Sequence, residues 1–138
     1  MKLQPPSPGP KEFFRAATDS LLDAKILFSA SRAVGDVYLG GYCVECSLKA
    51  LILLRAANSK RQIHAELFQG RKGHDLERLR GVYLKTGSSI PHDISNAFRR
   101  VNSWSTDLRY RTIRVKMEDA NEFLKSVELI FTWMERQF

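Results

Sequence analysis

One segment of the chain is apolar on almost every face that a helix would present. Its main stripe recurs at steps of three or four residues: Leu39, Cys43, Cys46, Ala50, Leu53 and Ala57. Most other faces are also filled by apolar side chains: Leu48, Leu51, Ile52 and Leu54. A helix that is apolar all round must be buried. We therefore predict a central helix, capped by Asp36, that the rest of the chain surrounds.

The surrounding segments read as amphipathic helices. We predict a helix over Lys11–Arg32 that Gly35 stops, a helix from His74-Asp75 to Gly87, a helix that starts at Ser89, and a last helix over Met117–Gln137. The Gly40-Gly41 pair predicts a tight helix crossing. Ser103–Arg114 breaks the pattern and is predicted as a loop. No segment requires a strand, so the expected fold class is all-α, an up-and-down bundle of four to five helices.

The domain organisation follows from length and the N-terminal prolines. We assign residues 1–10 to a disordered Pro-rich leader, because Pro5 to Pro10 cannot propagate a helix, and residues 11–138 to one bundle domain. There is no run of 18 apolar residues and no secretory signal. The expectation is a cytoplasmic protein without membrane contact, whose two cysteines are free thiols.

The positive charge is concentrated in the middle of the chain. The formal net charge is +7, but Arg55 to Lys116 contains 14 basic and 5 acidic residues, which gives +9 and leaves −2 for the flanking segments. This distribution fits either an anion-binding face or a solvated basic surface.

Two pairs of residues in the central helix are candidates for chemistry. Cys43 and Cys46 have the spacing of redox and zinc sites, but a structural zinc needs four ligands and a redox pair normally opens a helix after a strand. We interpret them as core packing and predict no metal and no cofactor. Glu45 and Lys49 are spaced for an intrahelical ion pair, which either emerges at the edge of the bundle or, if buried, needs further partners.

Histidines are the first candidates for acid and base chemistry near neutral pH. His74 and His92 are the candidate catalytic residues, and His64 is the third imidazole. The simpler interpretation of His74 and Asp75 is that they start a helix.

The best candidate for binding a nucleic acid or nucleotide is the predicted loop after the fourth helix. Arginine grips phosphate and aromatic rings stack on bases. The proposed contacts are Arg99, Arg100, Trp104, Arg109, Tyr110, Arg111 and Lys116, with Arg114 beside them. Alternatively, Trp104 and Tyr110 close the end of the bundle, and Asp107 with Arg109 ties the loop down.

Three blocks of sequence resemble prokaryotic HEPN-domain proteins. Gly40–Ile52 resembles the family's second helix, in which a tyrosine, an acidic residue and a lysine punctuate an apolar run. His74–Leu79 resembles its following helix start, and Asp107–Tyr110 the loop before its last helix. The resemblance implies a helical bundle, often a homodimer, commonly encoded beside a minimal nucleotidyltransferase in toxin and antitoxin modules.

The chain departs from the family's ribonuclease motif, an Arg followed after four to six residues by a His. No arginine stands at that distance before any histidine, and Lys85 before His92 is the nearest analogue but lacks the planar fork of arginine. We therefore favour a non-catalytic or weakly active module that binds RNA or a nucleotide and a protein partner. The alternatives are a metal-independent ribonuclease toxin, using His74 or His92 with Arg109, and a purely structural dimerisation protein.

Overall fold

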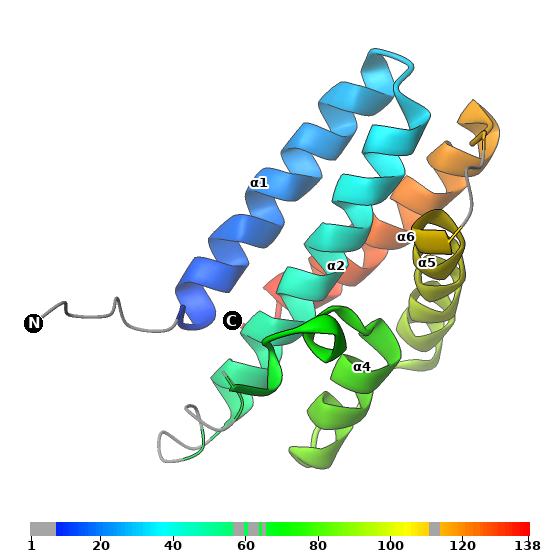
Figure 1. The fold of residues 1–138 in the computed structure, drawn as a ribbon. Helices are drawn as coiled ribbons and strands as arrows, with labels where there is room; N and C mark the ends of the chain where they lie inside the picture. Colours follow the sequence, from blue (N-terminus) through cyan, green and yellow to red (C-terminus); the bar gives the residue numbers. More distant parts are fainter. Residues whose placement is uncertain (1–7, 57–59, 61–63, 65, 111–113) are drawn as a thin grey trace, which may run out of the picture.

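The computed structural model describes residues 8–56, 60, 64, 66–110 and 114–138, and of residues 71, 72 and 104–110 the backbone only. Within these ranges there is no strand. The chain forms helices α1 (Pro10–Ser29), α2 (Ala33–Arg55), α4 (Leu76–Lys85), α5 (His92–Tyr110) and α6 (Met117–Glu135), and a 3-10 turn, η2 (Arg71–His74), precedes α4 (Figure 1). The predicted all-α bundle is confirmed.

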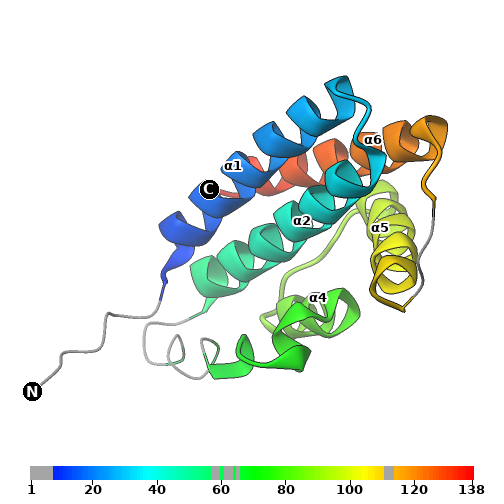
Figure 2. The same ribbon diagram turned by 45° about the horizontal axis from the view of Figure 1, so that its top comes forward.

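The helices are arranged around α2. α1 and α2 form an antiparallel hairpin, α6 packs along α2, and α5 packs on α6 (Figures 1 and 2). α4 and η2 cover the C-terminal half of α2, while its N-terminal half extends beyond them (Figure 1). Every residue from Cys43 to Leu53 is buried, as expected for a helix that is apolar all round.

The composition of α2 also meets the length and hydropathy requirements of a membrane-spanning helix. However, 78% of its most apolar window is buried inside the structure. Packing against the other helices therefore accounts for this composition.

Cys43 and Cys46 lie in the core as free thiols, as predicted. Burial raises the pKa of Cys43 to about 12 and that of Cys46 to about 11. Both thiols therefore stay protonated at neutral pH, which makes them poor nucleophiles and poor metal ligands.

The predicted close crossing occurs at Gly40, where α2 meets α6. A Cβ atom at this position would lie 2.8 Å from Cε1 of Phe123 and 3.3 Å from Cγ2 of Val127. Phe123 is itself buried and cannot easily move away. The absence of a side chain at Gly40 lets the two helices approach.

The start of α2 differs from the prediction. Its N-cap is Arg32, so Gly35 and Asp36 lie inside the helix and neither stops α1 nor caps α2. α1 ends earlier, at Ser29, and the chain reverses through Ser31 in the left-handed region (φ 59°). The chain reverses within residues 30–32. This segment contains no glycine, so a prediction based on glycine placed the end of the helix too late.

Two boundaries of α5 also differ. The helix begins at His92, so Ser89 is outside it and Pro91 directly precedes it. It continues to Tyr110, and the loop predicted from Ser103 is wrong. Nothing between Ser103 and Tyr110 is Gly or Pro, and Leu108 continues the apolar stripe one heptad after Val101.

α4 agrees with the prediction at both ends. The Asp75 carboxylate caps it by accepting a hydrogen bond from the backbone N–H of Arg78 at 3.2 Å. Gly87 follows its C-terminal turn with φ 87°.

Asp36 is fully buried (0% exposed), and neither carboxylate oxygen has a hydrogen-bond partner among the described residues. This burial raises the pKa of Asp36 from 3.8 to about 6. A raised pKa in the folded state stabilises the fold below pH 3.8, and this contribution is lost as the pH rises through about 6. At neutral pH the charged carboxylate therefore destabilises the protein.

Gly40 and Gly81 provide a matched test of packing inside helices. Gly40→Ala should lower the free energy of unfolding by about 1–2 kcal/mol, because the clash with Phe123 outweighs the better helix propensity of alanine. Gly81→Ala in α4, where no atom lies within 4 Å of the added Cβ, should raise it by up to about 1 kcal/mol. Urea titrations of both variants measure the difference, and equal effects would contradict the crossing.

Asp36→Asn should stabilise the protein at neutral pH, because the neutral amide avoids a buried charge. The expected gain over wild type is about 3 kcal/mol at pH 7, shrinking between pH 6 and pH 4. Thermal unfolding of both proteins across this range measures it, with the exposed Asp23→Asn as the control. A gain that does not change with pH would refute the assignment.

Candidate functional site

Glu45 and Lys49 form an ion pair in the interior, on the covered half of α2. Lys49 Nζ donates to Glu45 Oε2 at 3.0 Å, and each residue is only 5% exposed. The interpretation in which the pair emerges at the edge of the bundle is therefore wrong. A buried pair has to be desolvated, so further partners are expected.

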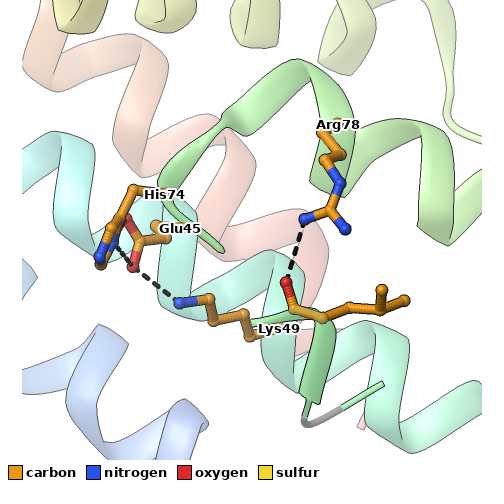
Figure 3. A network of polar contacts seen from close by, with 5 residues as sticks. Glu45, Lys49, His74 and Arg78 are labelled. Carbon is orange, nitrogen blue, oxygen red and sulfur yellow. Dashed lines mark hydrogen bonds and ion pairs between the residues drawn. The ribbon is translucent and has the colours of Figure 1, made fainter. Parts of the chain in front are cut away.

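His74, at the end of η2, is the further partner of Glu45. Its Nδ1 lies 3.0 Å from Oε1 and 3.1 Å from Oε2 of Glu45, while 52% of the His74 side chain is exposed (Figure 3). The carboxylate thus bridges a buried ammonium and a half-exposed imidazole. We call Glu45, Lys49 and His74 the polar network.

Two aromatic rings enclose the ammonium of Lys49. Its Nζ lies 5.8 Å from the ring centroid of Phe13, in α1, and 5.5 Å from that of Phe68. The two rings contact each other edge to face, with centroids 5.7 Å apart. Cation–π attraction adds to the ion pair, and the rings keep water away from it.

The backbone before His74 is shaped by glycines. Gly70 has φ 71°, which favours glycine, and any Cβ at the buried Gly73 would collide with the backbone carbonyl of Phe68. Arg78 Nη1 donates to the carbonyl of Leu67 at 3.0 Å and joins the start of α4 to this segment (Figure 3). Together these contacts hold His74 over Glu45.

This geometry suits acid and base chemistry at His74. A carboxylate that accepts the Nδ1 hydrogen fixes the orientation and the tautomer of an imidazole. An imidazole held in this way at the surface can exchange a proton with a bound molecule. Among the described residues, no cluster of three His, Cys, Asp or Glu side chains could hold a metal ion.

The predicted phosphate-binding residues lie on other helices. Arg99 and Arg100 are exposed on α5, where Arg100 Nε donates to Ser126 Oγ at 2.9 Å and Arg99 to Asn96 at 3.4 Å. Arg99 and Arg100 line an open cavity of about 330 Å³ with Ser103, Glu122, Phe123 and Ser126. The exposed Lys116 is the N-cap of α6, and Arg114 is exposed just before it. The side chains of Trp104, Arg109 and Tyr110, and all of Arg111, lie outside the described part of the chain.

The two candidate catalytic histidines lie on different helices. His92 is the exposed first residue of α5, whereas His74 contacts Glu45. The structure therefore brings His74, Glu45 and Lys49 together without His92. Sequence reasoning did not assign Phe13, Phe68 and Gly73 to the site. The sequence contained one signal for such neighbours: the charge of Glu45 inside an apolar helix requires a partner.

Comparison with known proteins identifies the family of the chain. The family model of the HEPN domain matches residues 10–137. No curated protein and no solved structure gives a significant match. Because the family match covers nearly the whole chain, the protein belongs to the HEPN domain family.

Proposed function

We propose that this protein binds RNA or a nucleotide at His74 and at the cations of α5. The observation that carries the proposal is the polar network, which presents a half-exposed imidazole over a buried carboxylate. Membership of the HEPN family supports a nucleotide- or RNA-related module in general.

Stability alone does not account for the polar network. Replacing a buried ion pair by apolar side chains of similar size is often neutral or stabilising, so burial of Glu45 and Lys49 favours a functional role. The sequence around His74 also suits a polyanion, since Arg71 and Lys72 precede it and Arg78 follows one turn later.

The cations of α5 supply the second part of the proposed surface. Arg99 and Arg100 are exposed on one helix, and their hydrogen bonds go to the uncharged side chains of Asn96 and Ser126. Neither interaction neutralises the guanidinium charge, so both arginines remain available to phosphate oxygens. We include Lys116, Arg109, Arg111, Trp104 and Tyr110 in this surface on their chemistry alone.

We also propose a homodimer and a protein partner in a toxin-antitoxin or defence system. The support is the resemblance to HEPN proteins that are encoded beside a minimal nucleotidyltransferase.

Removal of the α5 cations should weaken RNA binding and its dependence on salt. Arg99→Ala with Arg100→Ala should lower the slope of log affinity against log salt by about 0.7 for each lost phosphate contact. Fluorescence anisotropy with a labelled single-stranded RNA measures this slope. Lys11→Ala with Arg15→Ala, which removes the same charge from α1, is the control. Absence of RNA and nucleotide binding at low salt would refute the proposed function.

A second candidate function is a metal-independent ribonuclease, which the contact between His74 and Glu45 favours. His74 would remove the proton of a 2′-hydroxyl, whose oxygen attacks the adjacent phosphorus and displaces the 5′-oxygen, leaving a 2′,3′-cyclic phosphate. The leaving 5′-oxygen takes up a proton from water. The missing arginine of the family motif leaves the charge on the phosphate to other cations, of which Arg109 is the candidate.

Under this second function, His74→Ala should slow cleavage of total RNA, without divalent metal, by about 10²–10⁴-fold. Glu45→Gln should also slow cleavage, because the amide no longer orients the imidazole as the carboxylate does. His92→Ala should cleave like wild type. Identical cleavage by wild type and His74→Ala would remove this candidate and leave the binding function.

A further inference from the structure

The face of α2 that carries the polar network continues toward the N-terminus of the helix. Val34, Tyr38, Tyr42, Glu45 and Lys49 are spaced by four, four, three and four residues, which keeps all five in one row along a helix. One end of this row is buried by the segment 66–74 and by Phe13. The other end lies beyond the cover of η2 and α4 (Figure 1).

The exposed fraction of the side chains is much larger in the N-terminal part of this row than in its C-terminal part. Glu45 and Lys49 are 5% exposed, whereas Tyr42 is 43%, Tyr38 is 70% and Val34 is 51% exposed. Single apolar residues at a surface need no explanation, but three in one row next to a polar site form a continuous surface. We call Val34, Tyr38 and Tyr42 the tyrosine row.

The chemistry of the tyrosine row suits nucleobases. Tyrosine rings four residues apart on a helix have Cβ atoms about 5–6 Å apart, so adjacent bases of a single strand can reach both rings. The phenol of a tyrosine is uncharged at neutral pH and does not repel phosphate.

The sequence at His74 is complementary to a polyanion. Two basic residues, Arg71 and Lys72, precede His74 in η2. A ligand lying along the tyrosine row would therefore have aromatic faces beneath it and a basic segment at the end where His74 is held.

We propose that Tyr38 and Tyr42 stack bases of single-stranded RNA and guide the strand to His74. This inference rests on the proposed function and adds to it the class of nucleic acid and the residues that contact bases. Double-stranded RNA keeps its bases stacked inside the helix and cannot use these rings.

The test uses a single-stranded RNA oligonucleotide with 2′-O-methyl groups, which cannot be cleaved through the 2′-hydroxyl, and with 2-aminopurine as a fluorescent base. Tyr38→Ala with Tyr42→Ala should weaken binding about tenfold or more and abolish the quenching that stacking causes. Tyr38→Phe with Tyr42→Phe retains both rings and should restore affinity and quenching, which separates stacking from a general loss of structure.

Two controls define the site. Leu22→Ala with Ile26→Ala, which removes exposed apolar side chains from α1, should leave affinity unchanged. A duplex of the same sequence should bind the double alanine variant and the wild type equally.

The outcomes separate this inference from the proposed function. If wild type binds no RNA, both fail. If wild type binds RNA and Tyr38→Ala with Tyr42→Ala binds it equally well, only the tyrosine row is refuted. A second copy of the chain could cover the tyrosine row instead, and sedimentation tests this. If wild type is a dimer and the Tyr38→Ala with Tyr42→Ala variant is a monomer with unchanged RNA affinity, the row is a contact between two copies and the inference is overturned.

Discussion

The burial of α2 is the constraint on which the rest of this structure depends. A helix that is apolar on every face must be enclosed, and here α1, α4 and α6 each cover part of it. The same helix carries two carboxyl groups and one amine into the interior, those of Asp36, Glu45 and Lys49. Each of them has to be compensated or remains a cost to stability.

The three groups differ in the interaction partners that surround them. Glu45 and Lys49 are compensated by each other, by His74 and by the rings of Phe13 and Phe68. Asp36 has no hydrogen-bond partner within the described part of the chain. Compensation is therefore concentrated at the half of α2 where the chain also presents the imidazole of His74 to solvent.

Much of the fold could be predicted from the sequence because periodicity reports burial directly. The apolar stripes located α1, α2, α4 and α6, and the Asp75 cap and Gly87 located both ends of α4. The errors arose where a local signal competed with packing. Asp36 resembles a cap but lies one turn inside the helix, and the polar residues after Ser103 hid the continuation of α5 to Tyr110.

The candidate site was only partly predictable, for a different reason. Glu45 and Lys49 could be paired from their spacing alone, but the contact between Glu45 and His74 joins residues 29 positions apart and depends on the tight turn at Gly73. No periodicity encodes such a contact. The requirement for a partner was visible in the sequence, whereas its identity was not.

The spacing of Glu45 and Lys49 has a consequence for the order of folding. Because the two side chains are four residues apart in the same helix, their pair can form as soon as that helix forms, before any tertiary contact exists. α2 can then enter the core with these two charges already neutralised. If the carboxylate and the ammonium came from different helices, each would have to lose its hydration separately during collapse. The local pair thus lets the two charges be buried together, as one unit of a single helix.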